Sequence, residues 1–182
     1  MSKTPIRNIN DILDDPAFVR VNEERGRFQA RFGLLGKALG TGKIGVNVTE
    51  VPAGKTAWPR HYHYNNDEMF IVLAGTGVLH YGDDDFPLAE MDVAHIEAGT
   101  GIPFQIENTG EDPLRYLALS SLDPADVMVY PDSGKVGIMA LAAPHRDLSG
   151  GGLQPFRRWI AKDMEIGYWE GEAGAEQGVT PR

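Results

Sequence analysis

Short apolar runs alternate with turn-forming residues along the middle of the chain, from Arg27 to about Ser121. Gly, Pro, Asn and Asp separate these runs at regular spacing, and no helical period replaces them. This rhythm is typical of an all-β sandwich or barrel. The predicted strands cover residues 28–35, 43–51, 60–64, 68–73, 77–81, 86–89, 92–96, 103–108 and 114–120.

The two ends of the chain are less regular than its middle. Residues 1–26 mix small apolar patches with charge, which predicts an irregular N-terminal arm with one helical turn. The C-terminal extension, residues 122–182, includes one further possible strand at 126–130. Its later aromatic residues make it too apolar for a solvated linker, so we expect them to pack on the barrel, cover its mouth or contact a partner subunit. These aromatic residues are Phe156, Trp159, Tyr168 and Trp169.

Length and composition indicate one domain and narrow its possible partners. A chain of 182 residues can bury a sizeable core as a single unit. Its 17 Lys and Arg against 26 Asp and Glu give a net charge of −9, which argues against nucleic acid or an anionic membrane as a partner. The absence of cysteine excludes disulfides, thiol catalysis and zinc–thiolate sites. We find no signal peptide or membrane span in the sequence and therefore expect a cytoplasmic protein.

The most informative residues lie in the predicted strand at 60–64, where two of the five histidines stand one residue apart. Side chains at i and i+2 of a strand point to the same face, so His61 and His63 face a common spot. A turn at residues 65–67 then leads into the next strand, which can return Glu68 beside the two rings. Two imidazoles and one carboxylate suit iron, manganese, nickel or zinc. The alternative is an exposed polar strand face without a metal.

These residues stand in a recognisable order, Gly54, His61, His63, Glu68 and Gly75. The order resembles the first motif of the cupin superfamily, with six residues rather than five between the first glycine and the first histidine. The resemblance implies a cupin double-stranded β-helix, a jelly-roll barrel whose core covers about residues 27–121. It also implies a divalent metal ion, a small-molecule ligand and a homodimer.

The second motif of that family is only partly present. Gly99 and Asn108 match it, whereas Glu97 stands where proline is usual. The resemblance implies that the position of Phe104 is that of a fourth metal ligand, a histidine. A phenyl ring cannot coordinate, so three protein ligands remain, and such a set leaves coordination positions open for substrate or oxygen.

Strand alternation predicts which further side chains share the interior with the three ligands. Phe70 and Val72 follow Glu68 on the same face. On a later strand, Phe104, Ile106 and Asn108 share a face, so the five residues are expected to line a mixed apolar and polar pocket. Either Arg115 or Tyr116 must also point inward, and the alternation alone leaves this open.

Three functions are compatible with this pattern. The first is a metal-dependent enzyme, a dioxygenase, decarboxylase or isomerase, acting on a small polar substrate. The second is a non-catalytic module for a sugar or small acid, in which Phe104 fills the space of the metal. The third is a metal-free remnant that assembles with a partner through its aromatic tail. No general acid or base is assigned, and the candidates by residue type are Tyr81, His95 and Glu107.

Overall fold

A computed structural model describes residues 5–140, 156–161 and 163–164 of the chain. Within these ranges, strands dominate and form three sheets. Besides the strands there are helices α1 (Ile9–Asp14) and α2 (Leu35–Leu39) and the short 3-10 helix η1 (Pro131–Ser133). The all-β fold that the sequence predicts is confirmed.

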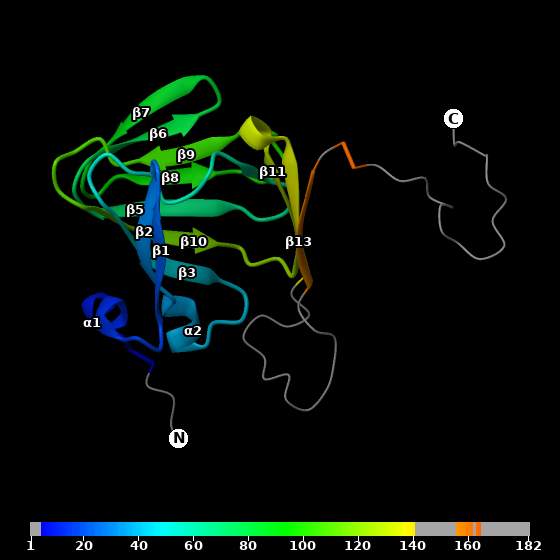
Figure 1. The fold of residues 1–182 in the computed structure, drawn as a ribbon. Coiled ribbons are helices and arrows are strands. Elements are labelled where there is room, and N and C mark those ends of the chain that lie inside the picture. Colours follow the sequence, from blue (N-terminus) through cyan, green and yellow to red (C-terminus); the bar gives the residue numbers. More distant parts are fainter. Residues whose placement is uncertain (1–4, 141–155, 162, 165–182) are drawn as a thin grey trace, which may run out of the picture.

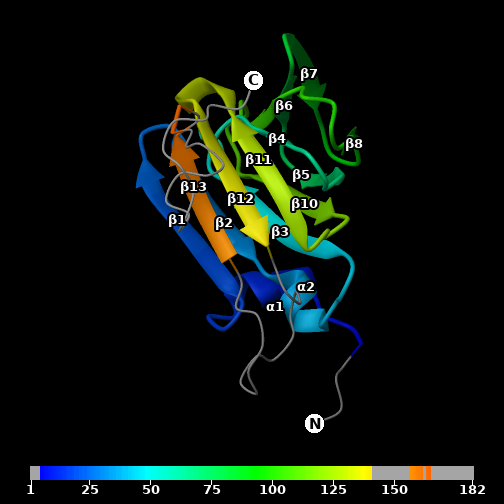
Figure 2. The ribbon, with the colours of Figure 1, turned by 90° about the vertical axis from the view of Figure 1, so that its right-hand side faces the viewer.

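All strand pairs in the three sheets are antiparallel. The largest sheet has the order β1 (Val19–Arg25), β2 (Phe28–Gly33), β3 (Gly45–Val51), β10 (Leu114–Ser120), β5 (Glu68–Ala74), β8 (Val93–Ile96). A second sheet has the order β7 (Asp84–Leu88), β6 (Gly77–Tyr81), β9 (Phe104–Glu107), and lies at the top of Figure 1. The third has the order β13 (Phe156–Ala161), β12 (Lys135–Ala140), β11 (Ala125–Tyr130), β4 (Tyr62–His63), and β13, β12 and β11 face the viewer in Figure 2.

The main core lies between the sheets, where inward-facing residues of several strands meet. Leu114 is fully buried, and Tyr116 and Phe70 are only 1% and 4% exposed. The rings of Phe70 and Tyr116 meet edge to face at a centroid distance of 5.7 Å, a favoured arrangement for aromatic pairs. This core therefore carries a band of aromatic side chains at the level of the candidate metal ligands.

A second, smaller core lies under the two α-helices, at the bottom of Figure 1. It is built from Ile12, Leu13, Leu35 and Val48. Strand β3 separates the two cores, because Val48 faces the helices while Val51, three residues on, faces the barrel interior. Among the described residues no helix has the length and apolar character needed to cross a membrane.

The N-terminal residues are more regular than the sequence suggests. Helix α1 buries Ile12 and Leu13, and the Asn8 side chain caps it by accepting a hydrogen bond from the Asn10 amide at 2.9 Å. Strand β1 pairs with β2 as the edge of the largest sheet. Most of β1 is exposed, so backbone pairing rather than an apolar face defines it. That is why its pattern of apolar residues does not reveal it.

The structure also settles which residue of β10 points inward. Tyr116 is buried in the main core, while Arg115 lies outside and binds Glu50 through Nη2 at 2.6 Å and Nε at 3.1 Å. The Arg115 side chain also donates to Asn10 Oδ1 at 3.1 Å. Arg115 is therefore part of a surface ion pair and leaves the interior without its charge.

Candidate metal centre

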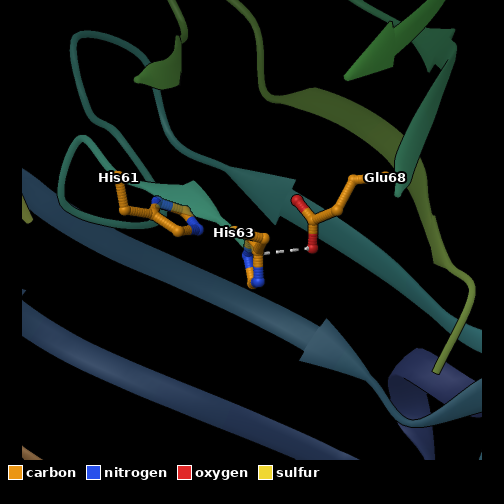
Figure 3. A group of neighbouring side chains, drawn as sticks. All are labelled: His61, His63 and Glu68. Carbon is orange, nitrogen blue, oxygen red and sulfur yellow. Dashed lines mark ion pairs between the residues drawn. The ribbon is translucent and has the colours of Figure 1, made fainter. Parts of the chain in front are cut away.

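Three potential ligands converge at one end of the barrel interior, as the sequence predicts. His61 directly precedes β4, His63 lies in β4, and Glu68 is the first residue of β5. One ligand atom from each lies within 4.8 Å of the others, and Figure 3 shows the two rings and the carboxylate turned toward a common space. Metal–ligand distances of about 2.0–2.2 Å place neighbouring ligand atoms roughly 3–4 Å apart. The group is thus close to the spacing that an ion requires.

Backbone pairing fixes both histidines from two sides. The His61 amide donates to the Phe104 carbonyl at 3.1 Å, and the Phe104 amide donates back at 2.8 Å. On the other side, β4 pairs with β11, so that His63 stands opposite Met128. The two imidazoles therefore sit on a strand held between β9 and β11, with ring centroids 5.0 Å apart.

The hydrogen bond of His61 determines which of its ring nitrogens is free. Nδ1 lies 2.8 Å from the carbonyl oxygen of Pro59. A carbonyl oxygen only accepts, so Nδ1 carries the proton and Nε2 keeps a lone pair. Burial, followed by the nearby His63, lowers the pKa of His61 to about 4. His61 is therefore neutral near pH 7 and has a nitrogen available for a metal ion.

His63 presents its other nitrogen in the same way. Its Nδ1 lies 2.5 Å from Asp126 Oδ2, and its Nε2 lies 3.6 Å from Glu68 Oε1. Nε2 is buried and has no hydrogen-bond partner, a costly arrangement for a polar atom. Burial lowers the pKa of His63, but the bond to Asp126 and the charges of Glu68 and Asp126 outweigh it and raise the net value. A cation between this buried nitrogen and Glu68, either a proton on Nε2 or a metal ion, would therefore stabilise both groups.

The surroundings of Glu68 disfavour its negative charge. Burial raises its pKa, the neighbouring Asp126 raises it further, and His63 only partly opposes this shift. Its side chain is 20% exposed. A carboxylate in this setting is stabilised by a positive ion, so the donor set fits a divalent metal.

The three residues open onto a cavity of about 260 Å³. Phe70, Phe104 and Ile106 line it, as the strand alternation predicts. Val72 and Asn108 do not, contrary to that expectation: Val72 lies in the main core, and Asn108 is fully buried. The Asn108 amide donates to the carbonyls of Val51 and Asp112 at 2.8 and 2.9 Å. It therefore braces a loop and does not face a ligand. The remaining lining residues are Asn47, Trp58, Pro59, Gln105, Tyr116, Ala118, Met128 and Tyr130.

Phe104 stands beside the candidate ligands and is 3% exposed. Its ring centroid lies 4.7 Å from that of His61 and 5.6 Å from that of Phe70. Tyr130 also stacks on the His61 ring, at 5.5 Å and an interplanar angle of 19°. The rings of Phe104 and Tyr130 thus pack against the His61 ring.

Asp126 and Tyr130 were missed by the sequence analysis as parts of the site. Both belong to β11, which forms where the sequence predicts a further strand, and Asp126, Met128 and Tyr130 share a face by alternation. That shared face was the available signal, but nothing in the sequence indicates that β11 pairs with the strand of the histidines.

The candidates for a general acid or base by residue type lie away from the cavity lining. Glu107 accepts a hydrogen bond from His80 Nε2 at 3.1 Å, and His95 is exposed on β8. Tyr81 packs at the edge of the main core. Tyr116, one of the two residues that the alternation left as possible inward positions, lines the cavity, and burial, together with the nearby Glu68, raises its pKa well above the usual tyrosine range. Its hydroxyl stays protonated at any physiological pH.

The aromatic tail is described in part. Phe156 and Trp159 lie on β13, where they are 43% and 53% exposed. Strand β13 pairs with β12, so this part of the tail extends the third sheet. Tyr168, Trp169 and the remaining histidine, His145, lie outside the described residues.

The sequence of this chain is similar to those of known proteins. Residues 47–120 match the family described as the Cupin domain. The oxalate-binding protein of Thermotoga maritima is 36% identical over 59 residues, which are 32% of this chain and 47% of the relative. The chain spans less than half the length of each curated relative that it matches.

Two solved structures share the fold. A sugar phosphate isomerase of the cupin superfamily from Silicibacter pomeroyi has a TM-score of 0.65 and 23% identity, covering 79% of this chain and 87% of that chain. A predicted oxalate decarboxylase from Thermotoga maritima has a TM-score of 0.53 and 24% identity, covering 65% of this chain and 99% of that chain. At these identities the similarity concerns the fold alone.

Proposed function

The chain belongs to the cupin superfamily, and from this premise we propose that it is a metal-dependent protein acting on a small molecule. His61, His63 and Glu68 would hold one divalent ion at the inner end of the cavity. The single observation that carries the proposal is the buried Nε2 of His63, which has no hydrogen-bond partner and faces the Glu68 carboxylate at 3.6 Å. A metal ion satisfies both groups at once.

Such an ion, held by two imidazoles and one carboxylate, acts as a Lewis acid with positions left for a ligand. Iron, manganese, nickel and zinc all accept this donor set. Phe104 adds no donor, so the protein contributes three ligands rather than four.

The walls of the cavity indicate what kind of ligand fits. Tyr116 offers a protonated hydroxyl, and Asn47 and Gln105 add neutral polar groups. The lining residues that the structure describes include neither lysine nor arginine. A phosphate group would find no cationic side chain there, and a carboxylate would rely on the ion.

We therefore favour a small oxygen-rich acid or keto compound, bound through its oxygens to the ion and packed against the aromatic wall. The similarity to the oxalate-binding protein of Thermotoga maritima supports a small acid as the ligand. Decarboxylation, isomerisation and dioxygenation are the reactions for which this site is suited, because each can proceed on a substrate whose oxygen atoms are bound and polarised by a metal ion.

One observation favours a second candidate, a binding module without metal. Phe104 fills the wall beside His61 with an apolar ring, at a centroid distance of 4.7 Å. In that case the cavity would bind a sugar or small acid through its polar groups alone.

Elemental analysis of protein purified without chelator and without an affinity-column metal distinguishes the two. The expected result is about one equivalent of a transition metal in the wild type and little in His61→Ala, since the variant keeps only two protein ligands. His95→Ala, which removes an exposed histidine on β8, is the matched control and should retain the metal. A stoichiometric metal in His61→Ala would refute the assignment of His61 as a ligand. A wild type that takes up no added ion would favour the binding module.

A further inference from the structure

The carboxylate of Asp126 lies behind His63, at the ring edge away from Glu68. The Nδ1 of His63 is 2.5 Å from Asp126 Oδ2, whereas its Nε2 faces the Glu68 carboxylate. The Asp126 side chain is fully buried, in a protein whose other acidic groups are mostly exposed. A buried carboxylate is expensive unless hydrogen bonds compensate it, so its partners reveal its role.

The other partners of Asp126 show that it accepts hydrogen bonds at both oxygens. The Asn65 backbone amide lies 3.1 Å from Oδ1, and the Asn66 side-chain amide lies 2.8 Å from Oδ2. Both of these groups are donors. A carboxylate that accepts from these two donors is ionised and only accepts, so His63 donates to it and the proton of the ring resides on Nδ1.

This arrangement determines what His63 offers to an ion. With the proton on Nδ1, Nε2 keeps its lone pair and points to the space between the candidate ligands. An unconstrained imidazole in water prefers the opposite tautomer, with the proton on Nε2, and in that form Nε2 has no lone pair for a metal ion. Carboxylates that bind the second nitrogen of a metal-ligating histidine fix its tautomer and orientation in this way.

We propose that Asp126 is a positioning residue of the metal centre, which holds the His63 ring in the orientation and tautomer that present Nε2 to the ion. The proposal rests on the proposed metal-dependent function. It assigns a role to a residue that lies beyond the family match at 47–120.

The surroundings of Asp126 keep it in place for this role. Strand β11 pairs with β4 on one side and with β12 on the other, so the carboxylate sits on a central strand of its sheet. Asn66, which donates to it, is 6% exposed and is itself anchored, since its Oδ1 accepts from Ser121 Oγ at 3.2 Å and from the Asp123 amide at 2.5 Å.

The tautomer of His61 is fixed by the backbone instead of by a side chain. Its Nδ1 donates to the Pro59 carbonyl, which a side-chain substitution leaves in place. Of the two histidines, only His63 depends on a side chain for its tautomer. Asp126 is therefore a position at which the tautomer of a candidate ligand, and with it the metal affinity, can be altered without replacing that ligand.

The test uses Asp126→Asn, which preserves shape but cannot accept hydrogen bonds from all three donors. Nitrogen-15 NMR of histidine-labelled, metal-free protein reports the tautomer of His63, and titration with zinc and with manganese reports the dissociation constants. We expect the wild type to hold the proton on Nδ1 and the variant to populate the Nε2–H form. We expect the affinity for both ions to fall about 10- to 100-fold in the variant.

Asp85→Asn is the matched control, because it makes the same substitution at an aspartate that contacts a different histidine, His80 Nδ1 at 2.6 Å, away from the cavity. The His63 tautomer and the metal affinity of this control should stay close to those of the wild type. An unchanged tautomer and affinity in Asp126→Asn would overturn the proposal, as would an equal loss in the control. If Asp126→Asn does not fold, the wild type still decides, because a neutral His63 ring with its proton on Nε2 and none on Nδ1 contradicts the assignment.

Failure of the proposed function looks different from failure of this inference. A wild type that binds neither ion refutes the metal centre. The tautomer in the metal-free protein remains measurable and still reports whether Asp126 orients His63.

Discussion

Replacing Phe104 with histidine tests whether the apolar ring stands where a fourth ligand would reach the ion. Phe104 and the three candidate ligands line the same cavity, and its main chain pairs directly with His61. A histidine at this position would extend the donor set from three protein groups to four. The same substitution removes a side chain that is 97% buried, because Phe104 is 3% exposed, so it changes stability and affinity in opposite directions.

The two effects can be separated by their size. Loss of the buried phenyl ring costs about 2–3 kcal/mol in the metal-free protein. For a chain of this length, that lowers Tm by roughly 4–12 °C. An added imidazole ligand should raise the metal affinity more than tenfold. A tenfold change in affinity corresponds to about 1.4 kcal/mol of binding free energy. At a metal concentration 100 times Kd, binding returns about 2.7 kcal/mol of stability.

The assay is thermal unfolding with and without zinc or manganese, combined with direct titration of each ion. We expect Phe104→His to melt below the wild type without metal and to show the larger rise in Tm on metal addition. Phe104→Leu is the matched control, since it also loses the phenyl ring but supplies no donor. If Phe104→His binds the ions no more tightly than Phe104→Leu, Phe104 does not occupy the fourth-ligand position.

Two further predictions concern the framework around the site. Glu50→Gln should cost about 1 kcal/mol near pH 7, because it weakens the ion pair with Arg115. Burial raises the pKa of Glu50, but its arginine partners outweigh this and bring it below 4.5. The contribution of Glu50 to stability is therefore present above pH 4.5 and is lost as the pH falls through its lowered pKa. Denaturant titrations should show that the difference in unfolding free energy between wild type and variant is smaller at acidic than at neutral pH. A difference that does not change with pH would contradict the ion pair. Gly75→Ala should cost about 2–4 kcal/mol in the same assay, since φ is +82° and the new Cβ would lie 2.7 Å from a backbone oxygen. Gly54→Ala, at φ +69° in open space, should cost only about 1 kcal/mol, and equal losses would refute the steric argument.

The ligand group was predictable because its signal is local. His61 and His63 are one residue apart on a strand, and a short turn returns Glu68 beside them, so alternation alone brings the three side chains together. The inward positions of Phe104 and Ile106 follow from the same period. Sequence reasoning succeeded for these residues because their neighbours are set by their own strand or by the next turn, whereas Val72, placed by the same alternation, lies in the core and does not line the cavity.

Features set by distant segments could not be read in this way. Asp126 meets His63 only because β11 pairs with β4, 63 residues away along the chain. The direction of Arg115 depends on its pairing with Glu50 and on an irregularity in the register of β10 against β5. Asn108 is a polar residue at an inward position that binds backbone carbonyls, and a sequence does not show which polar group a buried amide will satisfy.

Strand β11 lines the cavity from outside the segment that carries the candidate metal ligands. The potential metal ligands all lie within residues 47–120, whereas Met128 and Tyr130 complete the cavity wall from outside that span. Substitutions of Met128 and Tyr130 would reshape the cavity while every candidate ligand atom and Asp126 are retained. Exchanging these two residues alone is therefore a route to a cavity of different shape around an unchanged group of candidate ligands.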